Sequence, residues 1–196
     1  MHKETLEDIG EKELINRLRK FMPKNQVSDD CALIKTRNDN LLVNNDSLVE
    51  NVHFNNITTS PQDLAWKAVV CNISDLLSSG SKKTIGITIS LILPEKTEWV
   101  WVEELYKGIN KALKKYGGII LGGDCSKGNQ KTISITALGI QGELKLQRNA
   151  CSPGEIILTT GIHGLSKLGF MIKNENNFDN DISLNKRLIQ QSIEHF

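Results

Sequence analysis

Apolar residues recur along this chain with two different spacings, and these spacings predict an alternation of helices and strands. Helical spacing covers Leu14–Met22, a segment from the capping residue Ser60 to Gly80, and Thr97–Tyr116. Short apolar or alternating runs predict strands at Cys31–Ile34, Leu41–Val43, Thr84–Leu93, Ile119–Leu121, Thr132–Gly139 and Glu155–Thr160. This order is typical of an α+β domain in which helices cover one face of a mostly antiparallel sheet.

The C-terminal part of the chain reads as the beginning of a second, incomplete unit. It contains a predicted helix at Gly164–Ile172, an Asn-rich loop at Asn174–Asp181 and an amphipathic stretch at Leu184–Phe196. We therefore divide the chain into a helical segment at 1–25, a main domain at 26–142 and an unfinished domain at 143–196.

Composition and charge exclude several classes of protein. The 196 residues include 24 Lys and Arg against 23 Asp and Glu, so the formal net charge is only +1. Nucleic-acid binders and polybasic membrane anchors usually carry a basic excess. No apolar run approaches the roughly 18 residues of a membrane helix, no signal peptide is expected, and the four cysteines form no CxxC pair. We expect a soluble cytoplasmic protein that binds neither nucleic acid nor membranes.

Acidic residues recur beside the apolar runs. Asp29-Asp30 precede Cys31, Asp46 follows Asn44-Asn45, Asp75 lies on the first long helix, and Asp124 follows Gly122-Gly123. Carboxylates that gather in one place repel each other unless cations neutralise them, and oxygen ligands favour Mg²⁺, Ca²⁺ or Mn²⁺. Each acid taken singly also fits a turn or an exposed surface position, so spacing alone leaves both interpretations open.

Other candidate residues give weaker signals. Gly122-Gly123 would let a backbone approach a phosphate closely, but the chain has neither a P-loop nor a GxGxxG fingerprint. Arg148 suits phosphate oxygens or a solvated surface, and His53 beside Phe54 suits packing or catalysis. A GxxGxSxxG pattern at Gly161–Gly169 suits tight strand–helix packing or an anion at a helix N-terminus.

Taken in order, these segments resemble the thiamine-monophosphate kinase family of the aminoimidazole-ribotide-synthetase-like superfamily. The resemblance runs from about residue 25 to 170. Its motifs are Asp29–Leu33, Asn45–Glu50 with Val52–Phe54, Asp63–Ala68, Asn72–Leu76, Gly122–Asp124, Arg148–Ala150 with Pro153-Gly154, and Gly161–Gly169. The resemblance implies an ATP-dependent kinase that makes thiamine diphosphate from thiamine monophosphate by direct in-line transfer. It also implies a homodimer whose two N-terminal domains form a shared β-barrel.

The resemblance also implies roles for individual residues. Six of them correspond to ligands of a cluster of Mg²⁺ ions: Asp30, Asn44, Asn45, Asp46, Asp75 and Asp124. Four correspond to nucleotide contacts, namely Tyr106, Gly123, Asp124 and Arg148, and His53 corresponds to a substrate contact. No covalent nucleophile is implied.

Three departures from the family pattern stand out. Ser28 replaces a usual Gly, where a positive φ would strain it, and Asn44 and Asn45 replace a usual Ser or Thr. The chain also ends well before the family does, so we expect a fragment, a truncated gene product or a chain that works with a partner. Two alternatives stay open: a non-catalytic nucleotide-binding and dimerisation module, and another ATP-using member of the same superfamily.

Overall fold

The computed structural model of the chain describes residues 4–24, 26, 28–174 and 186–195. Contacts divide the chain into two compact units, Met1–Cys151 and Ser152–Phe196. The first unit holds helices α1 (Leu6–Leu18), α2 (Pro61–Ser78) and α3 (Trp99–Tyr116) and a short 3₁₀ turn at Arg19–Phe21. Its strands are β1 (Ala32–Lys35), β2 (Asn40–Val49), β3 (Ser81–Leu93), β4 (Ile119–Lys127) and β5 (Thr132–Gln141).

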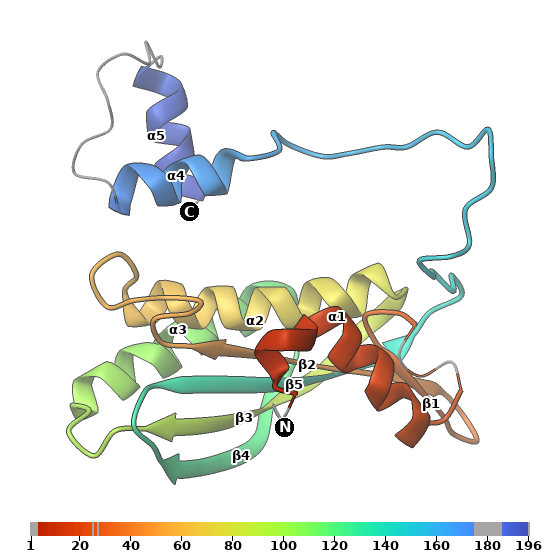
Figure 1. Cartoon of the computed structure of the whole chain (residues 1–196), viewed down its shortest axis with the longest axis horizontal. Helices are drawn as coiled ribbons and strands as arrows, with labels where there is room; N and C mark the ends of the chain where they lie inside the picture. The colour runs from red at the N-terminus through yellow and green to blue at the C-terminus, as the bar shows by residue number, and fades with distance from the viewer. Residues whose placement is uncertain (1–3, 25, 27, 175–185, 196) are drawn as a thin grey trace. The chain divides into compact units, whose positions relative to one another are not determined.

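The strands form one mixed sheet in the order β1-β2-β5-β3-β4 (Figure 1). Every neighbouring pair is antiparallel except β3 and β4, which are parallel. The parallel pair is joined through α3, which supplies the crossover that parallel strands need. The prediction of an α+β fold with a mostly antiparallel sheet is confirmed.

Helices α2 and α3 pack together against one face of this sheet (Figure 1). The alternation of β5 explains why, because Ile133, Ile135 and Ala137 are at most 1% exposed while the residues between them are only partly buried. Ile89 on β3 and Leu76 on α2 belong to the same core. We call the opposite side of the sheet, which carries Ser134 and Thr136, the open face.

The two long helices begin and end where local signals predict. The Oγ of Ser60 accepts a hydrogen bond from the backbone N–H of Asp63 at 3.1 Å, and Pro61 occupies the first helical position of α2. Gly80 follows α2 with a φ of 84°, and a Cβ there would lie 2.0 Å from the carbonyl oxygen of Leu144. Only glycine fits this position.

The first helix begins earlier than predicted. The sequence pattern predicts a helix at Leu14–Met22, whereas α1 covers Leu6–Leu18 and continues as a 3₁₀ turn. The turn before Gly10 is capped by a hydrogen bond of 2.7 Å from the backbone N–H of Thr5 to the Asp8 side chain. Gly10 kinks the helix with a φ of 69°, and it interrupts the helical pattern of the sequence at the same point.

Two strands extend beyond their predicted ends. Strand β2 continues through the polar residues Asn44 to Asp46, so Asp46 lies within the strand and not after it. Strand β4 continues through Gly122 and Gly123, where a turn was predicted, because its pairing with β3 is maintained after a bulge. The apolar run at Ile119–Leu121 also predicts a buried strand. This prediction is wrong, since β4 is an edge strand and Ile119 is 62% exposed.

The second unit has helices α4 (Leu165–Asn174) and α5 (Lys186–His195), at the two predicted amphipathic segments. The strand predicted at Glu155–Thr160 is absent; this segment is irregular, and Ile156, Ile157 and Leu158 are 85–96% exposed. A strand needs a hydrogen-bonding neighbour, and no described segment supplies one. Beyond Asn174, the predicted Asn-rich loop lies outside the described residues. Within the described ranges, no helix has the length and apolar character required to span a membrane.

Candidate functional site

The most buried polar cluster joins β2 to α2. The amide nitrogen Nδ2 of Asn44 donates to Asn72 Oδ1 at 3.2 Å and to Asp75 Oδ2 at 3.0 Å. Asn44 is 6% exposed and Asn72 is 1% exposed. The oxygen Oδ1 of Asn44 is buried and has no hydrogen-bond partner among the described residues. A buried acceptor of this kind is costly unless a ligand completes it.

Asp30, which precedes β1, lies at the other end of this cluster. Its Oδ2 accepts a hydrogen bond from Ser78 Oγ at 3.2 Å, next to the C-terminus of α2. Its Oδ1 pairs with the guanidinium of Arg148, and the backbone N–H of Arg148 donates to Asp29 Oδ1 at 2.9 Å. Residues 118 positions apart in sequence are thus brought together.

Electrostatics link these groups and bring in Asp46. Burial raises the pKa of the Asp75 carboxyl above its ordinary range, and the carboxylates of Asp46 and Asp30 raise it further. The hydrogen bond from Asn44 and the charge of Arg148 act in the opposite direction. Mutual repulsion between carboxylates is the situation that a divalent cation relieves.

A cavity of about 600 Å³ borders this cluster. Asp30, Asn44, Asn45 and Arg148 contribute to its lining, together with one side of α1. The helix supplies Lys12, Ile15 and Leu18, and the 3₁₀ turn and the residue after it supply Arg19 and Met22. Sequence reasoning missed α1 as part of a site, because its positive charges are isolated in a mixed-charge helix.

Asn45 does not point toward Asn44. Adjacent strand residues face opposite sides of a sheet, so Asn45 lies on the open face. Its Nδ2 donates to Ser134 Oγ at 3.1 Å and to Thr136 Oγ1 at 2.9 Å on β5.

Three of the four predicted nucleotide contacts lie on α3 or β4, away from Arg148, which pairs with Asp30. The phenol of Tyr106 on α3 interacts electrostatically with Cys125, and burial raises the pKa of Tyr106. Asp124 pairs in register with Ser90 of β3, on the open face, and its Oδ2 accepts from Ser126 Oγ at 3.0 Å. Because β5 and β3 separate β2 from β4, these two strands lie about 14 Å apart across the sheet.

The remaining predicted residue, His53, lies in the turn after β2. Its Nδ1 accepts a hydrogen bond from the backbone N–H of Val49 at 3.1 Å, and its side chain is exposed.

The backbone strain considered for Ser28 does not arise, because Asn51 alone among the described residues other than glycine has a positive φ.

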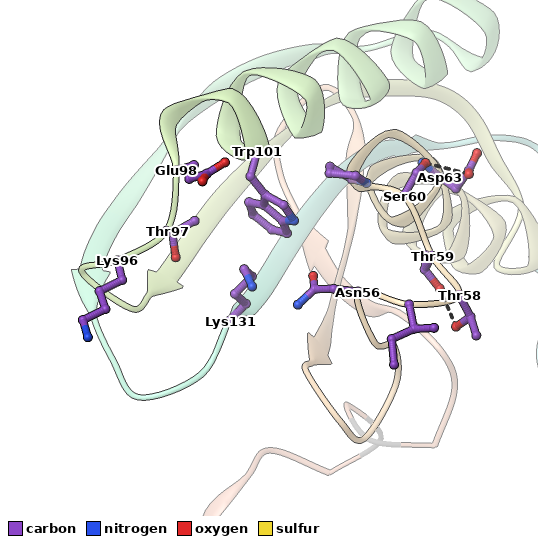
Figure 2. A pocket seen from close by; sticks show the side chains of 12 residues that line it. Asn56, Thr58, Thr59, Ser60, Asp63, Lys96, Thr97, Glu98, Trp101 and Lys131 are labelled. Atoms are coloured by element: carbon purple, nitrogen blue, oxygen red, sulfur yellow. Dashed lines mark hydrogen bonds between the residues drawn. The ribbon is translucent and has the colours of Figure 1, made fainter. Parts of the chain in front are cut away.

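A second cavity of about 600 Å³ lies where α2 and α3 begin (Figure 2). Figure 2 shows the ring of Trp101 facing the side chain of Lys131, with 5.3 Å between the Lys131 Nζ and the ring centroid. None of the residues predicted for the site lines this cavity. The ammonium of Lys131 is already paired with Glu50 at 3.1 Å.

The structure offers oxygen ligands but no complete metal cage. In the part of the chain that the structure describes, no three His, Cys, Asp or Glu side chains are placed to hold a metal ion. The donor set at β2 and α2 nevertheless consists of carboxylates and the unpartnered Asn44 oxygen. These oxygen donors fit a hard divalent cation that would be completed by water and phosphate oxygens.

A known protein family matches the part of the chain that contains the sheet and the candidate site. Residues 28–141 match the model of the N-terminal domain of AIR synthase related proteins. The chain belongs to this family. The match covers β1 to β5, with both helices that pack on the sheet.

Thiamine-monophosphate kinases are similar to this chain in sequence and in structure. A thiamine-monophosphate kinase of Prochlorococcus marinus is 53% identical over 169 residues, which are 86% of this chain and 51% of that protein. A solved structure described as AaThiL complexed with AMPPCP and TMP is 27% identical with a TM-score of 0.86, and covers all of this chain and 61% of that one. The thiamine-monophosphate kinase of Aquifex aeolicus superimposes with a TM-score of 0.80, 27% identity, and coverage of 98% and 61%. The chain spans about half the length of the curated relatives it matches.

Proposed function

We propose that this chain forms the N-terminal part of a thiamine-monophosphate kinase, which transfers a phosphoryl group from ATP to thiamine monophosphate and so makes thiamine diphosphate. The 53% identity to a thiamine-monophosphate kinase supports the choice of substrate. The observation that carries the chemistry is the partly buried Asn44–Asp75 pair, with the unpartnered Asn44 oxygen, beside a cavity whose lining includes Asp30 and Arg148.

We propose that Asp30, Asn44, Asp46 and Asp75 hold Mg²⁺ on the helix side of β2. When bound, Mg²⁺ neutralises phosphate oxygens and holds the two phosphate groups together. Arg148, which pairs with Asp30, supplies positive charge beside this position, and a guanidinium matches phosphate geometry. No side-chain nucleophile is needed, because an oxygen of the thiamine monophosphate phosphate attacks the γ-phosphorus of ATP directly while the bond to the β-phosphate oxygen breaks and ADP leaves.

Tyr106, Gly123 and Asp124 are the nucleotide contacts in this proposal, and His53 is the substrate contact. The homodimer is part of this proposal, with a second copy that packs on the open face. The open face carries short polar side chains that no described helix of the first unit covers except beside α1. A β-barrel shared by the two copies would cover the remainder of the open face.

We further propose that residues 26–142 bind ATP, Mg²⁺ and the second copy, with 1–25 leading into this domain and 143–196 beginning the next. All four cysteines are free thiols, which agrees with the reducing cytoplasm as the proposed location.

The test is formation of thiamine diphosphate by the purified chain from ATP, Mg²⁺ and thiamine monophosphate. Asp124→Asn, prepared in parallel, controls for a contaminating host kinase. We expect Mg²⁺-dependent AMPPCP binding by the wild type, with turnover that Asp124→Asn abolishes. A folded chain that binds no AMPPCP in the presence of Mg²⁺ would contradict the proposal.

A second candidate is a nucleotide-binding and dimerisation module without turnover. The nearly complete exposure of Ile156, Ile157 and Leu158 favours it, because this strand-like run has no neighbour among the described residues. It predicts AMPPCP binding and a dimer in light scattering, with no thiamine diphosphate formed. If another phosphate substrate were used instead, a substrate panel would show it.

A further inference from the structure

Asn72 is a polar residue on the core-facing side of α2, between Val69, Ile73 and Leu76, all at most 2% exposed. An amide in such a position is costly unless its polar groups are hydrogen-bonded. Asn72 Nδ2 donates to the backbone carbonyl of Ala68 at 2.8 Å, and Asn72 Oδ1 accepts from Asn44 Nδ2 at 3.2 Å. The residue therefore connects the helix backbone to the candidate site.

The polarity of this connection is determined at both ends. The carbonyl of Ala68 can only accept a hydrogen bond, so the Nδ2 of Asn72 must face it, and the Oδ1 of Asn72 must face Asn44. The ionised carboxylate of Asp75 can also only accept, so it too requires the Nδ2 of Asn44. Both hydrogen-bonding directions of the Asn44 nitrogen are thereby used.

What is left over is the Oδ1 of Asn44, which is buried and has no partner among the described residues. Rotating the Asn44 amide by 180° would place this oxygen against the oxygens of Asn72 and Asp75. The resulting repulsion between acceptors prevents the rotation. A buried oxygen that is held in one orientation with its lone pairs unused is suited to a hard cation.

We propose that Asn72 is a positioning residue, which fixes the Asn44 amide so that its Oδ1 is presented as a ligand to a divalent cation. This inference rests on the proposed function, because that function supplies the cation. Partners that orient a metal ligand in this way typically change metal affinity by roughly 10- to 100-fold when they are removed.

The experiment measures Mn²⁺ binding to the full chain by electron paramagnetic resonance, with and without AMPPCP. We expect Asn72→Leu, which has similar volume but no amide, to weaken Mn²⁺ binding at least about tenfold. Asn72→Ser is a second variant in case Asn72→Leu does not fold, since its hydroxyl still reaches the Ala68 carbonyl but not Asn44. Ile73→Val is the matched control, because it shortens a buried neighbour on α2 without touching the amides, and its Mn²⁺ affinity should equal that of the wild type.

A double-mutant cycle separates positioning from general loosening of the core. If Asn72 acts through Asn44, the double variant Asn44→Ala with Asn72→Leu binds Mn²⁺ no more weakly than Asn44→Ala alone. Additive effects would overturn the inference, as would wild-type Mn²⁺ affinity in a folded Asn72 variant.

The two proposals fail in different ways. A wild-type chain that binds no Mn²⁺, with or without AMPPCP, would overturn the Mg²⁺ part of the proposed function, and the role of Asn72 with it. Mn²⁺ binding by the wild type that is unchanged in the Asn72 variants would overturn the role of Asn72 alone.

Hydrogen exchange of the Asn44 side-chain amide, measured by NMR without metal, should be slow in the wild type and faster in Asn72→Ser. Equal exchange rates would also contradict the positioning role.

Discussion

Glu50 and Lys131 form a largely buried ion pair, and removing its negative charge should destabilise the fold substantially. The Oε1 of Glu50 accepts from Lys131 Nζ at 3.1 Å and from Asn56 Nδ2 at 2.5 Å, and its Oε2 accepts from the Lys131 backbone N–H at 3.1 Å. Both side chains are 14% exposed. The pair ties the end of β2 to the beginning of β5.

The expected loss of unfolding free energy follows from the contacts that Glu50→Gln leaves unsatisfied. Glutamine has the same shape, but one of its terminal atoms must be an N–H₂ group that faces a donor of Lys131. The largely buried ammonium then loses its counter-charge, and either the backbone N–H or the ammonium of Lys131 loses its acceptor. Breaking one side of a buried pair costs about 3–5 kcal/mol, and partial exposure brings our expectation to about 2–3 kcal/mol.

The pH dependence has a definite sign. Burial alone would raise the pKa of Glu50, but the hydrogen bonds from Lys131 and Asn56 and the charge of Lys131 outweigh it, so the pKa lies below its ordinary value. The contribution of a carboxyl with a lowered pKa is complete above its unfolded pKa of about 4.3, and is lost as pH falls through the folded value. The difference in stability between wild type and Glu50→Gln should therefore be constant from pH 6 to 8 and shrink below about pH 4.

Urea unfolding followed by tryptophan fluorescence measures this difference, because Lys131 lies over the ring of Trp101. Glu95→Gln is the matched control, since Glu95 pairs with Lys127 at 2.6 Å but both side chains are about 70% exposed. The control should stay within about 0.5 kcal/mol of the wild type. A loss below about 0.5 kcal/mol in Glu50→Gln, or one that persists unchanged at low pH, would refute the reasoning.

Three further changes test the fold itself. Ser60→Ala removes the hydrogen bond from the Asp63 N–H and should lower the free energy of unfolding in urea by about 1 kcal/mol. An unchanged free energy of unfolding would contradict the capping role of Ser60. Ile135→Ala empties a fully buried position and should cost about 2–5 kcal/mol by the same measurement; a loss below 1 kcal/mol would argue against this core. Gly123→Ala places a Cβ 1.9 Å from the carbonyl oxygen of Ile89, so hydrogen exchange should accelerate in β4 and not in β5. Unchanged protection of β4 would show that β4 does not pair with β3 as described.

Helices with strong local signals were predictable. Ser60, Pro61 and Gly80 act within a few residues of the ends of α2, and the alternation at Thr132–Gly139 reports directly that one side of β5 is buried. Strand ends were not predictable in the same way. Asn44 to Asp46 read as the end of an apolar run, yet β2 continues through them because Asn45 bonds to Ser134 and Thr136 of β5, about 90 residues later.

The chemistry of the candidate site was visible in the sequence, but its arrangement was not. The acidic residues and the amides could be selected by type and order. Their distribution over the two sides of the sheet depends on register, which separates Asn44 from Asn45 and places Asp124 on the open face. Asn72 read only as an interruption of an apolar pattern, although it holds the Asn44 amide.

The sequence by itself determined the two long helices α2 and α3, the α+β class and the residue types available for binding a hard cation. These features depend on interactions between residues that are near each other in the chain. Only the tertiary structure decided the strand order, the sides to which the polar side chains point and the lack of a strand at Glu155–Thr160. Those features depend on hydrogen bonds to a neighbouring strand, and the identity of that neighbour is not encoded in the local pattern.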